Sequence, residues 1–121
     1  MIDLKKTTVL QVKNVSKKYG KKSILNDISF ELQTGDIVGL VGSNGAGKTT
    51  TLKLISSLVS IDQGQILING FDIKKEREKA LQNLSAIIET PGLYPYFTGL
   101  ENLEYLAAIH QTPREELTQI I

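Results

Sequence analysis

A glycine-rich stretch between two apolar segments limits what this chain can fold into more than any other feature. Residues 42–50 are GSNGAGKTT. The preceding segment, DIVGLVG (36–42), is apolar on both faces, which is typical of a strand buried in a parallel sheet. The segment AGKTTTLKLISSLVS (46–60) then places Leu52, Ile55 and Leu58 on one face of a helix. A buried strand, a glycine turn and an amphipathic helix in succession predict an α/β chain.

The spacing within this stretch matches G-x-x-x-x-G-K-[ST], the pattern of a phosphate-binding P-loop. Glycines let successive backbone N–H groups point inward around an anion, and the helix N-terminus adds a partial positive charge. We expect Lys48 to reach the β- and γ-phosphates of a nucleotide, Thr49 to offer its hydroxyl to Mg²⁺, and Thr50 to donate to the α-phosphate. The alternative is a plain glycine turn before a helix, which the strand and the helix on either side disfavour. The predicted nucleotide-binding residues are therefore Gly42, Ser43, Asn44, Gly45, Ala46, Gly47, Lys48, Thr49 and Thr50.

The segments around this loop predict three consecutive parts of one domain. Residues 1–36 contain two alternating segments, TTVLQVKNVSKKYG and SILNDISFELQTGD, which favour an antiparallel pair of strands. Residues 37–89 hold the P-loop core, with strands expected at 37–41, 64–70 and 85–89. Residues 90–121 begin a helical part, in which Thr98 and Glu101 have the spacing of a capping box. The predicted fold class is a P-loop α/β core with parallel strands and N-terminal antiparallel strands. It is incomplete, because a helix predicted from residue 112 is still open at residue 121.

The bulk properties exclude several classes of protein. The net charge of +1 gives no overall field that would favour nucleic acid, so no nucleic-acid partner is expected. The absence of cysteine excludes disulfides and thiolate metal sites. No segment is apolar enough to span a membrane, and the N-terminus lacks the apolar run of a signal peptide. We therefore expect a cytoplasmic protein.

The chain resembles the ATP-binding subunit of ABC transporters. The resemblance is carried by VGSNGAGKTTTLKLISSLVSIDQGQILINGFDI (41–73) and continues through GLYPYFTGLENLEYLA (92–107). A narrower likeness to exporters of the bacitracin and lantibiotic type is carried by IIETPGLYPYFTGLENL (87–103). The resemblance implies ATP and Mg²⁺ as cofactors, a second ATP-binding subunit, and a position at the inner face of the cell membrane.

Tyr19 and Glu89 gain their expected roles from this resemblance. In the family, an aromatic residue at the position of Tyr19 stacks on the adenine ring; a half-buried tyrosine that closes a strand is the alternative. Most members have glutamine where this chain has Glu89, and that side chain ligates Mg²⁺. Glutamate is also a suitable ligand, because it offers a hard, charged oxygen, and the alternative is an exposed acid at the end of a strand. An apolar strand that ends in an acid could also hold a general base, but the family's base follows a longer apolar run and belongs to an Asp-Glu pair.

Residues 90–97, TPGLYPYF, form an unusually apolar loop. Two interpretations stay open: the loop docks on the transmembrane permease subunit, as the resemblance implies, or Leu93, Tyr94 and Phe97 pack into a local core.

Hydrolysis needs groups that the resemblance places beyond residue 121. The phosphoryl-transfer site requires a Walker B aspartate and a residue that positions water, and no Asp-Glu pair follows an apolar run in these 121 residues. We therefore expect the parent protein to be an ATPase and this chain to bind nucleotide with no catalytic residue of its own. Two alternatives are a non-hydrolysing nucleotide-binding module and a cytosolic ABC ATPase without a membrane partner.

Overall fold

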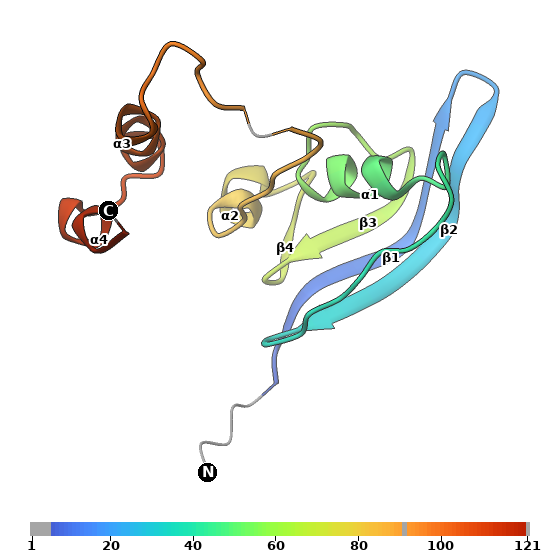
Figure 1. The fold of residues 1–121 in the computed structure, drawn as a ribbon. Helices are drawn as coiled ribbons and strands as arrows, with labels where there is room; N and C mark the ends of the chain where they lie inside the picture. The colour runs from blue at the N-terminus through green and yellow to red at the C-terminus, as the bar shows by residue number, and fades with distance from the viewer. Residues whose placement is uncertain (1–5, 91, 121) are drawn as a thin grey trace. The chain divides into compact units, whose positions relative to one another are not determined.

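The computed structural model describes residues 6–90 and 92–120 and divides the chain into two compact units between Glu89 and Thr90 (Figure 1). The predicted parts 1–36 and 90–121 and the predicted loop 90–97 include residues 1–5, Pro91 or Ile121. Those residues lie outside the described ones. The first unit contains β1 (Thr8–Tyr19), β2 (Lys22–Gln33), α1 (Lys48–Ile55), β3 (Gln63–Ile68), β4 (Phe71–Asp72) and α2 (Arg77–Leu81). The second unit contains α3 (Gly99–Ile109) and α4 (Arg114–Ile120).

The first unit is built on a four-stranded antiparallel sheet in the order β2-β1-β3-β4. Strands β1 and β2 form a hairpin in which Tyr19 pairs with Lys22. Strands β3 and β4 are joined through Asn69 and Gly70, whose φ angles of 50° and 82° suit a tight two-residue turn. The predictions of alternating antiparallel strands before residue 36 and of a strand near 64–70 are confirmed.

One core holds this sheet and its helices together. Leu54 of α1 and Ala80 of α2 pack with inward residues of the strands, so both helices lie on the sheet through the same apolar cluster (Figure 1). Helix α1 buries Thr51 and Leu54, whereas Leu52 and Leu58 of the predicted apolar face are 45% and 65% exposed, so the predicted face is wrong. The helix also ends at Ile55 rather than near residue 60. The buried members of the cluster are Val12, Val15, Leu25, Leu54, Ile61, Ile66, Ile68, Ile73 and Ala80.

A bulge at the β1–β3 edge shapes the end of β1. The β1–β3 register shifts between Lys13 and Ser16, opposite Gly64, whose φ is +90°. A Cβ at residue 64 would run into the backbone carbonyl oxygens of Lys13 and Asn14, so only glycine fits at this position.

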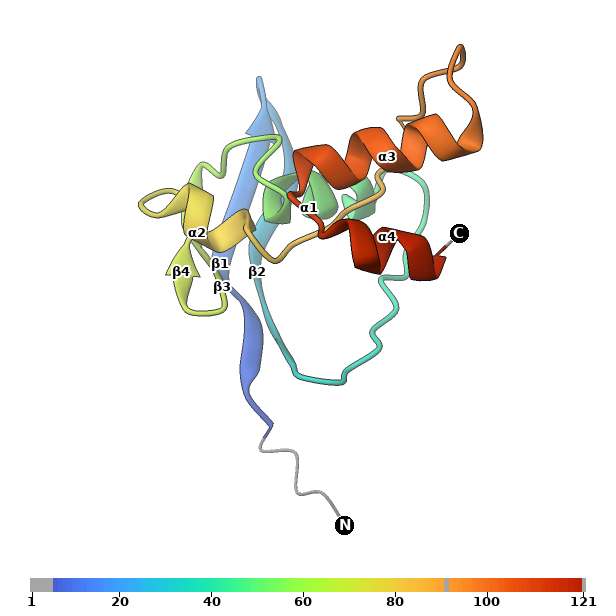
Figure 2. The same cartoon turned by 90° about the vertical axis from the view of Figure 1, so that its left-hand side faces the viewer.

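Two predicted strands are not formed. Residues 37–41 have no strand pairing, and Ile37 and Val41 are 100% and 90% exposed. Figure 2 shows the chain between β2 and α1 running clear of the sheet. Residues 85–89 are also irregular, and Ile87 is 75% exposed. A strand that is apolar on both faces needs neighbours on both sides, and none of the described strands pairs with either segment.

The second unit contains the helices α3 and α4, and α3 begins at the predicted capping box. The Thr98 hydroxyl accepts from the backbone N–H of Glu101, and the Glu101 carboxylate accepts from the backbone N–H of Thr98, so the capping box is complete. The buried Asn102 amide bonds to the backbone of Tyr94, Phe97 and Thr98, which ties the preceding loop to α3. In residues 6–90 and 92–120, no helix has the length and apolar character that a membrane crossing requires.

Candidate phosphate-binding site

The glycine-rich loop enters α1 through a left-handed residue. Ala46 N–H donates to the Ser43 carbonyl over 3.1 Å, which closes a turn inside the loop. Gly47 follows at φ +92° as the N-cap of α1. A Cβ on Gly47 would lie 2.6 Å from Leu25 Cδ2, so this position needs glycine both for its backbone conformation and for its contact with the core.

The first turn of α1 leaves its backbone donors open. The first helical hydrogen bond runs from Thr51 N–H to the Gly47 carbonyl over 2.8 Å. Among the described residues, the N–H groups of Lys48, Thr49 and Thr50 donate to no backbone carbonyl, and no side chain caps the helix. Unpaired N–H groups and the positive end of the helix dipole together attract an anion.

Lys48 adds a full positive charge at the loop. Its ammonium group donates to the carbonyl oxygen of Gly42 and, over 2.7 Å, to that of Ser43. The side chain therefore folds back along the loop whose N–H groups would surround a phosphate. Both acceptors are neutral carbonyls, and a charged phosphate oxygen is the stronger hydrogen-bond partner for an ammonium group.

An open pocket of ≈ 250 Å³ lies against this loop. Ligand pockets for small molecules span roughly 300–1,000 Å³, so this volume suits part of a nucleotide, such as its phosphate chain. The pocket is lined by Lys22, Ile24, Asn44, Gly45, Gly47, Lys48, Thr49 and Thr50. Sequence reasoning missed Lys22 and Ile24, because only the folded chain brings the start of β2 against the loop.

Tyr19 stands at the end of β1, outside the lining of this pocket. It pairs in the sheet with Lys22, which does line the pocket, and the tyrosine is 48% exposed. The Lys17 ammonium lies over its ring, 5.5 Å from the ring centre. The structure therefore leaves ring surface open, and the stacking role of Tyr19 stays a prediction.

Glu89 contacts α1 rather than the glycine loop. Its carboxylate accepts from the Lys53 ammonium over 3.2 Å, and its backbone has a φ of 69°. Lys53 and Thr49 are four residues apart on α1, so they share one face of the helix. Glu89 thus belongs to the face that carries the Thr49 hydroxyl, one turn farther along the helix.

The donor set for Mg²⁺ is small. Thr49 and Glu89 supply oxygen atoms of the kind that Mg²⁺ prefers, and the ion usually takes its other ligands from water and phosphate. In the described part of the chain, no three side chains of His, Cys, Asp or Glu gather as a metal site. The residues present therefore fit an ion that arrives with a nucleotide better than a site made by protein alone.

The loop before α3 carries an aromatic cluster, defined as Tyr94, Phe97 and Tyr105. Tyr94 lies 5.2 Å from Phe97 and 4.9 Å from Tyr105 between ring centres. Tyr94 donates to the Tyr105 hydroxyl over 3.2 Å, and this hydrogen bond raises the pKa of Tyr94. The three residues are 47%, 43% and 41% exposed. Local packing is therefore present, and apolar ring surface also stays accessible, so both predicted interpretations of this loop keep support.

Comparison with known proteins gives one consistent result. The family described as ABC transporter matches residues 25–121. The linearmycin resistance ATP-binding protein LnrL of Bacillus subtilis (strain 168) is 46% identical over 97 residues, which are 80% of this chain and 31% of that protein. The bacitracin transport ATP-binding protein BcrA of Enterococcus faecalis is 38% identical over 101 residues, which are 84% of this chain and 33% of that protein.

A solved structure described as an ATP binding subunit of an ABC transporter has a TM-score of 0.81 and 37% identity, over 90% of this chain and 45% of that one. This likeness confirms the predicted fold class. The chain spans about a third of the length of the two curated relatives, 31% and 33%.

Proposed function

The chain belongs to the ABC transporter family of ATP-binding proteins, as its resemblance predicted, and on that premise we propose that it binds ATP with Mg²⁺ at Gly42–Thr50. The observation that carries this proposal is the open first turn of α1. Its N–H groups at Lys48, Thr49 and Thr50 have no backbone acceptor among the described residues, and the Lys48 ammonium lies at the same loop. The triphosphate is the one part of a nucleotide that uses all these donors.

Different residues of the site would bind different parts of the nucleotide. The loop N–H groups and Lys48 hold the phosphates, and the Tyr19 ring stacks on the base. Thr49 and Glu89 offer oxygen ligands to Mg²⁺, which when bound neutralises charge on the phosphates. Glu89 accepts from Lys53 through Oε1, so its second carboxylate oxygen would serve as the ligand to the ion.

We infer that ATP hydrolysis belongs to a longer parent protein, similar in length to the relatives named above. Electrostatic groups placed around the reacting phosphate supply most of the rate in such sites. Glu89 was the one acid weighed above as a possible general base, and its carboxylate is engaged with Lys53 of α1 instead. The 121-residue chain is accordingly proposed to bind nucleotide without hydrolysing it, whereas the parent protein couples hydrolysis to transport.

The relatives suggest the biological role of that parent protein. LnrL is named for linearmycin resistance, and BcrA for bacitracin transport. We propose that the parent protein powers export of an antibiotic of this general kind. It would work on the cytoplasmic face of the membrane, with a permease subunit docked at residues 90–97 and with a second ATP-binding subunit. The exposed rings of the aromatic cluster support the docking surface.

Calorimetry with Mg-ATP tests the binding proposal. The wild-type chain is expected to bind, and Lys48→Ala is expected to lower the affinity by about 10- to 100-fold, the usual effect of losing a charge-assisted hydrogen bond. Lys75→Ala is the matched control, because Lys75 is exposed and lies outside the pocket. A folded wild-type chain that gives no binding, or equal affinities for both variants, contradicts the proposal.

A further inference from the structure

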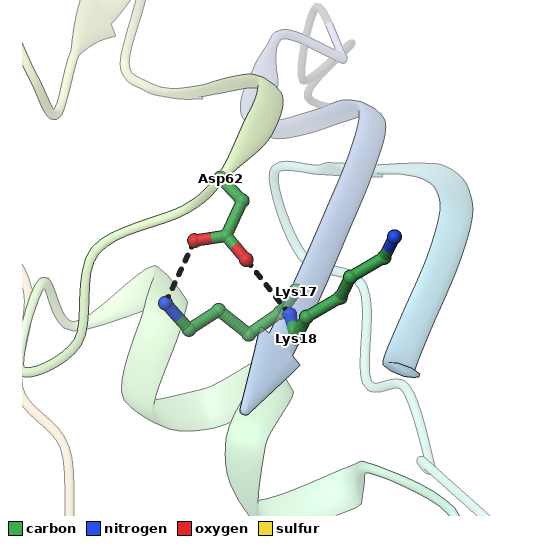
Figure 3. A network of polar contacts seen from close by, with 3 residues as sticks. All are labelled: Lys17, Lys18 and Asp62. Carbon is green, nitrogen blue, oxygen red and sulfur yellow. Dashed lines mark hydrogen bonds and ion pairs between the residues drawn. The ribbon is translucent and has the colours of Figure 1, made fainter. Parts of the chain in front are cut away.

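The carboxylate of Asp62, just before β3, accepts hydrogen bonds from two consecutive residues near the end of β1 (Figure 3). Asp62 Oδ1 accepts from the Lys17 ammonium over 2.9 Å, and Asp62 Oδ2 accepts from the Lys18 backbone N–H over 2.8 Å. The Asp62 N–H also donates to the Ser16 carbonyl over 3.2 Å. Three hydrogen bonds, two of them through the carboxylate, therefore fix Asp62 against the last residues of β1.

Lys17 differs from the other lysines that form ion pairs in the described residues, because its charged side chain is almost fully buried. Its side chain is 9% exposed, whereas that of Asp62 is 41% exposed. A buried ammonium group needs a charged partner, and Asp62 supplies it. The Lys18 N–H and the Lys17 ammonium keep the pKa of Asp62 below its ordinary value of 3.8, so the carboxylate is charged at neutral pH.

The same ammonium group lies over the Tyr19 ring, 5.5 Å from its centre. This distance lies within the range of a cation–π interaction. Tyr19 has nearly half of its surface exposed, at 48%, and it is the sheet partner of Lys22 at the edge of the phosphate pocket. The cation thus holds one face of the ring, and ring surface stays open for a second partner.

We propose that Lys17 and Asp62 are positioning residues, which hold the Tyr19 ring ready to stack on the base of the bound nucleotide. This inference rests on the proposed function and deepens it. A tyrosine at the end of a hairpin loses rotamer freedom when a base stacks on it. Lys17 restricts the ring before binding, and Asp62 acts through Lys17 by fixing its ammonium group.

The test compares two ligands that differ by the nucleoside. Calorimetry measures Mg-ATP and Mg-tripolyphosphate binding to the wild-type chain and to Lys17→Met, which keeps the length of the side chain and removes its charge. We expect Lys17→Met to lower ATP affinity by about three- to tenfold and to leave tripolyphosphate affinity unchanged. Lys17→Arg keeps the cation and is expected to keep ATP affinity.

Two further variants separate positioning from a structural role. Lys18→Met is the matched control, because Lys18 uses only its backbone N–H and its side chain extends away from Asp62 in Figure 3. It should leave both affinities unchanged. Asp62→Asn keeps the size of the side chain and should repeat the selective loss of ATP affinity, and it replaces Lys17→Met if that variant does not fold.

A Tyr19→Ala background completes the test. Adding Lys17→Met to Tyr19→Ala should lower ATP affinity no further, because the ring through which Lys17 acts is gone. If Lys17→Met loses the same affinity for both ligands, or lowers ATP affinity further in the Tyr19→Ala background, the positioning role is overturned. The proposed binding of phosphate by the wild-type loop is not affected by either result. A wild-type chain that binds neither ligand overturns the proposed function and this inference together.

Discussion

The β1–β2 hairpin and residues 37–41 are neighbours in sequence, and both are rich in apolar residues, yet only the hairpin forms a sheet. In the hairpin, Val12 and Val15 are 3% and 1% exposed. In the second segment, Ile37 and Val41 are 100% and 90% exposed. Apolar content therefore does not decide which segment becomes a strand.

The difference lies in where each segment finds its partner. The two strands of the hairpin are joined by the short turn at Gly20 and Lys21, so pairing closes a very small loop. A strand that is apolar on both faces needs a partner on each side, and such partners come from distant parts of a chain. Local pairing is satisfied within the described residues, and pairing of residues 37–41 is not.

Matched valine substitutions give the largest expected effect. Val15→Ala removes two methyl groups from the core and should lower the free energy of unfolding by about 2–3 kcal/mol. Val41→Ala makes the same chemical change at a site that is 90% exposed and should change it by less than about 0.5 kcal/mol. Urea denaturation followed by circular dichroism measures both. If Val41→Ala destabilises as much as Val15→Ala, residues 37–41 are packed in solution and the contrast fails.

A smaller effect is expected from the capping box of α3, which is another locally satisfied feature. The backbone N–H of Thr98 holds the pKa of Glu101 below its ordinary value of 4.5. A lowered pKa in the folded state means that this contribution is present above pH 4.5 and is lost as the pH falls through the folded pKa. The helicity of residues 99–109, followed by Cα chemical shifts, should therefore decline below that pH.

Glu101→Gln is the control for this prediction. Glutamine can still accept from the Thr98 N–H as part of a capping box, but it does not titrate. The acid-dependent part of the helicity that belongs to residue 101 should be absent in this variant. Identical pH profiles for the two chains would show that another group causes the decline.

Features that depend on neighbouring residues could be predicted from the sequence better than features that depend on a distant partner. The capping box, the hairpin strands and the start of the P-loop helix depend on residues close together in the chain, and each is predicted close to its observed place. The buried face of that helix and its end were predicted wrongly, because they depend on what the helix packs against. The strands at 37–41 and 85–89 were wrong because periodicity cannot show whether a partner strand is present.

The site was predictable to a similar extent. The loop from Gly42 to Thr50 could be predicted because the spacing of its motif determines which residues surround the phosphates. The part played by Lys22 and the Lys17–Asp62 pair depends on contacts between segments far apart in the sequence. No local pattern marks those residues, so only the folded sheet brings them to the loop.

We propose above that the open N–H groups at the start of α1, together with Lys48, bind the phosphates of ATP. An amide-resolved NMR titration of the chain with Mg-ATP tests it most directly. Saturable shifts are expected at Gly45, Gly47, Lys48, Thr49 and Thr50, with the amides of α4 unchanged. Saturating nucleotide that leaves these five amides unmoved, or that shifts amides throughout the chain equally, would contradict it.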